Sequence, residues 1–458
     1  MRLSASLAAV LLASPLLAQS IQPRMGAPVP GLTAAQLDRF NKGRAAANDP
    51  LPVVDGLGPI FNDSACASCH AQPTAGGSSD VAVTRFGKAA SGGNPFDPLE
   101  DLGGSLLQSQ AIAGGCEEVV PPEADVTAQR GTPPLFGAGL VEAILDADIV
   151  DYQDHPPPGV SGRVHWIQPV EDPTGPLRAG RFGWKDQEAT VMSFSAGASL
   201  NEMGLTNRFF MSENAPNGDQ SRLATCDSVP DPEDGPDSEG FDKIDRFTDF
   251  QRFLAPPPRT PRSGMTGEAI FNAAGCASCH VSTPYLTGAA AEVALSGVEI
   301  TPYSDFLLHD MGTLGDGIVQ GDATETEFRT PPLWGLHTRG QIALLHDGRA
   351  SSGTFEENVD AAITAHDGEA AAARDNYLAL PNPQKLLLIQ FLDSLGRAEF
   401  DYEGDNDVDA FDWFFLQPLF TGPGAFYTAD DFASIADIDQ DGDFDLVDFG
   451  ALQRAFGQ

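Results

Sequence analysis

The sequence predicts a mainly α-helical protein in which one domain occurs twice, joined by long loops and followed by a small acidic C-terminal module. The stretch IFNDSACASCH at 60–70 returns as IFNAAGCASCH at 270–280, and RGTPPLFGAGL at 130–140 returns as RTPPLWGLH at 329–337. Alternating strand patterns are scarce, whereas TAAQLDRFNKGRAA, LVEAILDADIV and PQKLLLIQFLDSL have helical spacing. Residues 401–458 hold fourteen acidic side chains and one arginine.

Two markers that recur in the same order indicate that a whole domain was duplicated. We therefore expect a first copy at 25–253 and a second at 265–398. The Pro-rich stretch LAPPPRTPRSG at 254–264 would be a stiff linker between them. The change in composition near residue 400 marks a third module at 400–458.

The N-terminus has the pattern of a secretory signal peptide over residues 1–18. Arg2 supplies a short positive region, LAAVLLASPLLA is an apolar run, and a small-residue cleavage site follows at Ala18. We therefore expect an exported protein, periplasmic or extracellular. No second apolar run approaches the length that a membrane span needs, so no span is expected.

The net charge argues against one class of partner, and the cysteine count predicts a disulfide. The formal net charge is −39, with 65 acidic against 26 basic side chains, so nucleic acid is not an expected partner. Of the six cysteines, four lie in the repeated motifs, which leaves Cys116 and Cys226. In an oxidising compartment this pair predicts a disulfide, and two separate buried thiols are the alternative.

Each repeated stretch ends in Cys-x-x-Cys-His, the attachment motif of c-type haem. Two thioether bonds fix the haem to the cysteines, and the histidine becomes an iron ligand. A redox disulfide or half of a zinc site would also contain two such cysteines, but neither motif has the further Cys or His that zinc needs. We therefore predict two covalently bound haem c groups, attached through Cys66, Cys69, His70, Cys276, Cys279 and His280.

An ordered set of motifs extends this pattern from about residue 60 to 395: CASCH, TPPLFGAGLVEAI, GRFGWK, NEMGLT, the second CASCH, LLHDMG, FRTPPLWGL, LLHDGRA and HDGEA. The set resembles the bacterial di-haem cytochrome c peroxidase superfamily, and most closely its di-haem oxidoreductase branch, sometimes labelled thiol oxidoreductase. The resemblance implies two cytochrome c-like haem domains. It also implies a peroxidase-like enzyme that reduces hydrogen peroxide at the N-terminal haem, with electrons delivered through the C-terminal haem from a small donor.

The resemblance assigns roles to two residues of the first copy. Glu202 in NEMG matches the family's Glu-Met-Gly element, so it would move a proton between the peroxide oxygens during O–O cleavage. Trp184 in GRFGWK matches the tryptophan between the two haems, so it would relay electrons. Taken alone, Glu202 would be a solvated carboxylate and Trp184 a core aromatic residue.

The sixth iron position separates a catalyst from an electron carrier, because only an open iron readily binds peroxide. By the same resemblance His366 is the distal ligand of the second haem, with Met311 as its rival, and His346 lies beside that haem without binding iron. The histidine that the peroxidases carry shortly after the first motif is absent. The first haem is therefore five-coordinate, or capped by another residue such as Met203.

Residues 401–412 and 437–448 follow the spacing of an EF-hand loop, with Asn406 and Gly442 at the turn position. A short helix is expected after each loop. Together they resemble a type I dockerin, which implies bound Ca²⁺ and a cohesin-like scaffold partner, whereas a disordered acidic tail is the alternative. The expected calcium ligands are Asp401, Glu403, Asp405, Asp409, Asp412, Asp437, Asp439, Asp441, Asp445 and Asp448.

Two functional hypotheses follow. The first is an exported di-haem peroxidase that reduces hydrogen peroxide or uses it to oxidise a partner. The second is a di-haem electron-transfer cytochrome without peroxidase chemistry, attached to an extracellular assembly through its tail. The NEMG element and the long insertion between the first haem motif and TPPL favour the enzyme, because a carrier needs neither.

Overall fold

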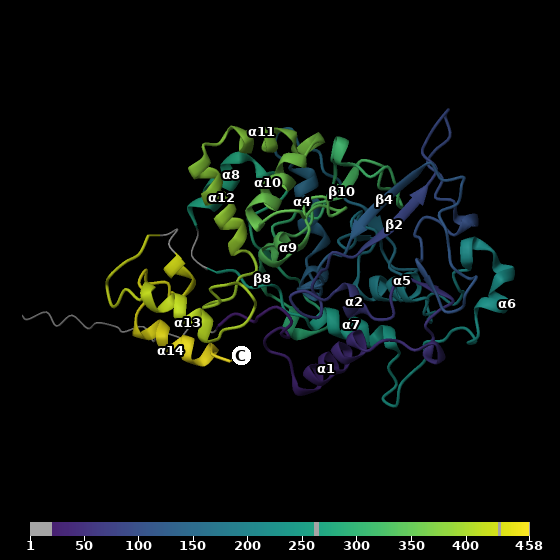
Figure 1. Cartoon of the computed structure of the whole chain (residues 1–458), viewed down its shortest axis with the longest axis horizontal. Helices are drawn as coiled ribbons and strands as arrows, with labels where there is room; N and C mark the ends of the chain where they lie inside the picture. The colour runs from purple at the N-terminus through teal and green to yellow at the C-terminus, as the bar shows by residue number, and fades with distance from the viewer. Residues whose placement is uncertain (1–20, 261–264, 429–431, 458) are drawn as a thin grey trace, which may run out of the picture.

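The computed structural model describes residues 21–260, 265–428 and 432–457 (Figure 1). The expected signal peptide at 1–18 lies outside the described residues. Helices and irregular segments make up most of the described chain, and its strands are short, so the prediction of a mainly helical protein with long loops is confirmed. Among the described residues, no helix combines the length and the apolar character that crossing a membrane requires.

The helices fall into three groups along the chain. The first group comprises α1 (Ala34–Asn48), α2 (Cys66–Cys69), α3 (Ala138–Glu142), α4 (Asp146–Asp154), α5 (Val191–Met203), α6 (Leu223–Cys226) and α7 (Lys243–Phe253). The second comprises α8 (Thr266–Ala274), α9 (Leu336–Ile342), α10 (Phe355–Ala365), α11 (Ala371–Ala379) and α12 (Asn382–Ser394). The third comprises α13 (Ala410–Leu416) and α14 (Leu446–Ala455), which lie in the yellow lobe of Figure 1.

The strands pair two by two, and every pair is antiparallel. The pairs are β1 (Ile60–Phe61) with β3 (Gln110–Ala111), β2 (Ala82–Gly87) with β4 (Val126–Gly131), β5 (Trp166–Ile167) with β6 (Arg178–Ala179), β7 (Tyr285–Leu286) with β8 (Glu299–Ile300), and β9 (Leu308–Asp310) with β10 (Glu327–Arg329). The long β2–β4 ribbon sets Arg85 opposite Ala128 and Val83 opposite Arg130.

Sequence signals explain where the helices begin and end. The Thr33 hydroxyl accepts a hydrogen bond from Gln36 N, and the Gln36 side chain accepts one from Thr33 N, which closes a capping box at the start of α1. The stretch LVEAILDADIV forms two short helices, α3 and α4, rather than the single one its spacing predicts. The predicted terminal helix before Gly396 is α12.

Two helix crossings have the same construction. In the first, α1 packs on α7 at Gly43, where an added Cβ would meet the Arg246 carbonyl oxygen at 2.3 Å. In the second, α8 packs on α12 at Gly267, where a Cβ would meet the Leu387 carbonyl oxygen at 2.0 Å. Glycine thus allows close backbone contact at both crossings.

The two TPPL segments also share a backbone conformation. Gly137 and Gly335 have φ of 72° and 77°, and each stands at the N-cap of the helix that follows, α3 and α9 respectively. The two turns lie close together, since a Cβ on Gly137 would meet the Trp334 ring at 2.8 Å. A positive φ at these positions explains why both segments carry glycine there.

Buried apolar side chains form three clusters. The first contains Phe40 and Phe250 from the N-terminal helices, but it also takes in Tyr285, Phe306 and Trp334 from beyond the second motif. The second is built on α8, α10, α11 and α12, and the third lies within residues 400–455. The first core therefore uses residues from both halves of the chain.

The described part of the Pro-rich stretch, 254–260, is packed rather than free. Leu254 and Ala255 are fully buried. Gly137 N donates to the Leu254 carbonyl oxygen at 3.2 Å, and Gly396 N donates to the Pro258 carbonyl oxygen at 2.8 Å. This segment therefore contacts both the α3 region and the end of α12, which a freely exposed linker would not do.

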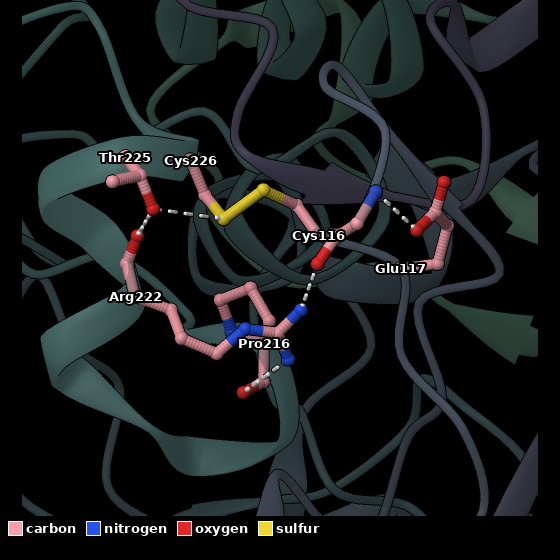
Figure 2. Close-up of a disulfide and its surroundings, with 7 residues drawn as sticks. Cys116, Glu117, Pro216, Arg222, Thr225 and Cys226 are labelled. Atoms are coloured by element: carbon pink, nitrogen blue, oxygen red, sulfur yellow. Dashed lines mark hydrogen bonds between the residues drawn. A yellow bond between two sulfur atoms is a disulfide. The ribbon is translucent and has the colours of Figure 1, made fainter.

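Cys116 and Cys226 are joined in a disulfide (Figure 2). Arg222, one turn before Cys226, donates hydrogen bonds to the carbonyl oxygens of Pro216 and Gly115. It therefore contacts the segment that carries Cys116. The disulfide and Arg222 together tie the start of the 227–237 loop to the 113–118 segment.

The C-terminal module contacts the body of the protein through the loop at 401–412. Met25 N donates to the Asn406 side-chain oxygen at 3.2 Å, and the Asn406 amide donates back to the Met25 carbonyl oxygen at 3.1 Å. His337 on α9 lies with Nε2 at 3.0 Å from the Gly404 carbonyl oxygen. The module is thus attached to the body by specific hydrogen bonds as well as by the chain.

Candidate haem sites

The two motif histidines have the same hydrogen-bonding arrangement. Nδ1 of His70 lies 3.1 Å from the Gly77 carbonyl oxygen, and Nδ1 of His280 lies 3.0 Å from the Tyr303 carbonyl oxygen. A proton on Nδ1 leaves Nε2 as the nitrogen that can bind a metal. Burial lowers the pKa of both imidazoles to about 4, so both are neutral, as an iron ligand must be.

Each motif opens into its own cavity. The N-terminal cavity, of about 660 Å³, is lined by Cys66, Cys69 and His70. The C-terminal cavity, of about 410 Å³, is lined by Cys276, Cys279 and His280. A cavity beside two cysteines and an oriented imidazole is what a covalently attached haem requires, so the residues present fit the group at both places.

The four motif cysteines are not paired in disulfides, which leaves their sulfurs available for attachment. Burial raises the pKa of the Cys66 thiol to about 12 and that of the Cys276 thiol to about 12. Burial also raises the pKa of the Cys279 thiol, although its hydrogen bond with His309 offsets part of that rise.

His366 and Met311 both line the C-terminal cavity, as the sequence analysis expects of the two rival ligands. Nδ1 of His366 lies 2.7 Å from the Ala362 carbonyl oxygen, the same arrangement as in the two motif histidines. Burial lowers the pKa of His366, and its imidazole lines the same cavity as that of His280. Nε2 of neither ring has a hydrogen-bond partner among the described residues.

Trp184 lines both cavities. Its ring is 8% exposed, its Nε1 donates to the Gly131 carbonyl oxygen at 2.9 Å, and the Arg339 guanidinium lies 5.2 Å from its ring centroid. The His346 ring meets it edge-on at 6.3 Å and stacks on Phe328 at 4.2 Å. An indole is therefore held rigidly in the wall that the two cavities share.

Glu202 stands near the end of α5 and lines the N-terminal cavity with the first motif. Asn62 Nδ2 donates to its carboxylate at 2.8 Å, and the backbone N–H of Asn62 donates to its carbonyl oxygen at 2.7 Å. Burial raises the pKa of Glu202, while the Asn62 hydrogen bond and the Arg85 charge offset part of that rise. Met203, the expected alternative cap, is buried and also lines this cavity.

Two residues of this cavity were not predicted from the sequence. Asn62 belongs to the repeated IFN, so the repeat itself was a signal that could have identified it. Arg85 on β2 lines the cavity, and its buried Nε has no hydrogen-bond partner. Nothing in the local sequence distinguishes Arg85 from a surface arginine on a strand.

His309, which lies downstream of the second motif, is placed differently from His366. Its Nε2 lies 2.9 Å from Asp305 and its Nδ1 lies 3.0 Å from Glu369, while the Cys279 sulfur lies 3.8 Å from Nδ1. Burial alone would lower the pKa of His309, but hydrogen bonds with Asp305, Cys279 and Glu369 raise it to about 12. A charged imidazole held between two carboxylates cannot serve as an iron ligand.

The two acidic loops of the tail fold alike. Asp401 accepts hydrogen bonds from the backbone N–H groups of Gly404, Asp405 and Asn406. Asp437 accepts the corresponding three, from Gln440, Asp441 and Gly442. The turn positions Asn406 and Gly442 both have positive φ, 74° and 92°.

The last acid of each loop closes it in the same way. Asp412 accepts from the N–H groups of Tyr402 and Asp409, and Asp448 accepts from those of Ile438 and Asp445. Carboxylate oxygens of Glu403, Asp439 and Asp443 are buried without a partner. Burial raises the pKa of Asp448 to about 6, and a cation among these oxygens would relieve that penalty.

Comparison with known proteins identifies the family. A model of the family described as "Di-haem oxidoreductase, putative peroxidase" matches residues 119–395, which include Trp184, Glu202, the second motif and His366, and begins after the first motif. The chain belongs to this di-haem oxidoreductase family. Membership implies two haem groups and an oxidoreductase.

Comparisons with curated proteins and with solved structures give no further identification. No curated protein matches the chain. Among solved structures, a chain titled "Kuenenia stuttgartiensis Hydrazine Synthase Pressurized with 20 bar Xenon" is similar at 13% identity and a TM-score of 0.37, over 86% of this chain and 99% of that one. A similarity this low carries no conclusion about fold or function.

The His309 cluster predicts a pH window for stability. Burial would raise the pKa of Glu369, but hydrogen bonds with His309 and Ser161 lower it to about 2, so its contribution is lost as pH falls below about 4.3. The pKa of His309 is raised to about 12, so its contribution is complete below about pH 6.5 and lost as pH rises above that value. Thermal unfolding of the holoprotein against pH should show the largest difference between wild type and His309→Gln between these limits. A difference that does not change with pH would contradict the ion-pair assignment.

Proposed function

We propose that this chain is an exported di-haem c-type oxidoreductase that reduces hydrogen peroxide at the N-terminal site with electrons that arrive through the C-terminal site. Family membership supports an oxidoreductase with two haems. The observation that carries the more specific proposal is the pair of cavities: Glu202 lines only the one beside His70, His366 lines only the one beside His280, and Trp184 lines both. Export is supported by the pattern at residues 1–18 and by the disulfide.

Covalent attachment at both motifs is part of the proposal. Its support is the matching placement of His70 and His280, each with Nδ1 on a backbone carbonyl oxygen and with two unpaired cysteines beside it. Duplication of a cytochrome c-like domain is supported by the glycine crossings at Gly43 and Gly267 and by the TPPL turns. Together these features recur in the same order in both halves of the chain.

In this proposal the side chains of the N-terminal cavity transfer a proton to the peroxide and stabilise negative charge that develops on it. A haem held through Cys66, Cys69 and His70 would supply the iron and the electrons for peroxide reduction. Glu202, with its pKa raised by burial, can hold a proton and give it to the departing oxygen. Arg85 lines the same cavity, and its positive charge would favour developing negative charge there.

The C-terminal side of the proposal concerns electron delivery. His366 would hold the haem iron together with His280, since the two line the same cavity and the Nε2 of His366 has no hydrogen-bond partner among the described residues. Trp184, rigid in the shared wall, is the proposed relay between the two sites. A small electron donor would act at the C-terminal site.

We further propose that the tail binds Ca²⁺ and attaches the enzyme to a cohesin-like scaffold. Two loops with equivalent hydrogen bonds support the calcium sites. The helices that follow them expose large apolar side chains, which suits a protein partner. These are Phe411, Phe414, Leu446 and Val447, at 52%, 69%, 71% and 57% exposure.

Electron paramagnetic resonance of the ferric protein tests the central proposal. We expect one high-spin and one low-spin haem, with loss of the high-spin signal when peroxide is added, because only the C-terminal site has His366. His366→Ala should convert the low-spin signal to high-spin, whereas Met311→Leu should leave it unchanged. Two low-spin haems that do not respond to peroxide would instead identify an electron carrier.

Steady-state peroxide reduction tests the role of Glu202. Glu202→Gln should lower turnover by roughly 10²-fold, the usual size of a general-acid contribution. In wild type the rate should fall as pH rises through the raised pKa of Glu202, and the variant should lack this fall. Glu188→Gln changes another carboxylate of the same cavity and is the matched control. Equal rates for Glu202→Gln and wild type would exclude the proton-transfer role.

A calcium titration followed by hydrogen exchange tests the tail. Amides of 401–412 and 437–448 should gain protection as Ca²⁺ is added, because the cation holds the acidic oxygens that the loops bring together. Asp437→Ala should abolish the gain in the second loop and leave the first loop responsive. A tail whose exchange is the same with and without Ca²⁺ would exclude the calcium loops.

A further inference from the structure

A cluster of acidic side chains lies outside the haem motifs and outside the tail. Oxygen atoms of Glu213, Asp227 and Asp231 lie within 4.8 Å of one another. The cluster is formed by the segment after α5 and by the 227–237 loop, two stretches that approach each other only in the folded protein.

Glu213 is the unusual member. It is 5% exposed, and among the described residues neither of its carboxylate oxygens has a hydrogen-bond partner. A buried carboxylate without a partner is strongly unfavourable, so such groups in native proteins normally have a specific partner. Among the described residues no Lys, Arg or His forms an ion pair with any of the three acids.

Neighbouring groups hold the carboxylates in place instead of neutralising them. The Thr206 hydroxyl donates to Asp231 at 3.0 Å, and Thr206 N donates to Glu233 at 3.2 Å. Asp227 accepts from Val229 N at 3.0 Å. The other oxygen of Glu233, Oε1, is buried without a partner. Four acids are thus gathered and oriented, with free oxygens remaining.

We propose that Glu213, Asp227 and Asp231, with Glu233 beside them, bind a Ca²⁺ ion. The ligands are all carboxylate oxygens, which calcium prefers, and neither nitrogen nor sulfur donors are part of the group. Asp231 is exposed and Asp227 half-buried, so the ion can enter from solvent and retain water on that side, while Glu213 closes the site from within. Burial and then the charges of Glu233 and Asp231 raise the pKa of Glu213 to about 10, a penalty that a divalent cation removes.

The position of the site gives it a structural role. Asp227 directly follows Cys226, whose disulfide with Cys116 anchors the start of the loop (Figure 2). Glu213 lines the N-terminal cavity, and Asn214 next to it donates to the Asn201 side chain at 3.3 Å, beside Glu202. Bound calcium would join the disulfide-anchored loop to the wall of that cavity.

Calcium counting on the full-length holoprotein tests this assignment. After equilibrium dialysis against Ca²⁺, the double variant Glu213→Gln/Asp231→Asn should hold one ion fewer per chain than wild type, whatever the tail binds. Glu123→Gln alters an exposed acid outside the cluster and should bind as many ions as wild type. Equal counts in wild type and the double variant would overturn the proposal.

Hydrogen exchange on the wild-type chain gives a readout that does not depend on the variant folding. Saturating Ca²⁺ should slow exchange of amides in 206–234 at least about tenfold, because a ligand that binds only the folded segment reduces its opening. The tail loops, followed in the same experiment, report their own binding separately. If the acids merely share protons, exchange in 206–234 will not respond to Ca²⁺ and Glu213→Gln will stabilise the protein at every calcium concentration, which would overturn the assignment.

Discussion

The hydrogen bond from a histidine Nδ1 to a backbone carbonyl oxygen is the interaction on which both candidate haem sites depend. It fixes the ring of His70 against Gly77 and that of His280 against Tyr303, and it selects the tautomer that leaves Nε2 free. A carbonyl oxygen is a neutral acceptor, so each imidazole remains uncharged in its buried setting. In each motif the cysteines four residues and one residue before the histidine are the proposed attachment points for the same haem.

The two sites differ in the chemistry of their surroundings. Ionisable and amide groups from β2 and α5 line the N-terminal cavity, where Arg85 and Glu202 are within each other's electrostatic reach. The C-terminal cavity contains His366, whose Nδ1 lies near a backbone carbonyl oxygen as that of His280 does. Trp184 lies between the two cavities. Its indole N–H is not left unpaired there, because Nε1 donates a hydrogen bond to the Gly131 carbonyl oxygen.

Sequence reasoning predicted the features that depend on local sequence patterns. The helices at 34–48 and 382–394 and the positive φ at Asn406 and Gly442 follow from spacing and residue type. It did not locate features that arise from contacts far apart in the chain. Nothing local shows that Phe306 packs into the first core, or that Leu254 is fully buried within a Pro-rich stretch.

The acids at 213–233 illustrate the same limit. In the sequence they are ordinary members of a polar loop and a preceding segment, and only folding brings them within reach of one another. The pair Asn62 and Glu202 is similar, since 140 positions separate two side chains that share a hydrogen bond. Local signals thus specify helices and turns, while tertiary contacts create the charged environments.

The hydrogen bonds between His337 and Gly404, and between Met25 and Asn406, have a thermodynamic consequence. The backbone that these bonds hold is the same backbone that Asp401 folds into a loop. Cation binding by that loop and the rigidity of α9 are therefore thermodynamically coupled. Each changes the other by the same free energy. If the loop binds the proposed cation, loosening of the body by heat would weaken that affinity, and a filled loop would in turn make the body harder to unfold.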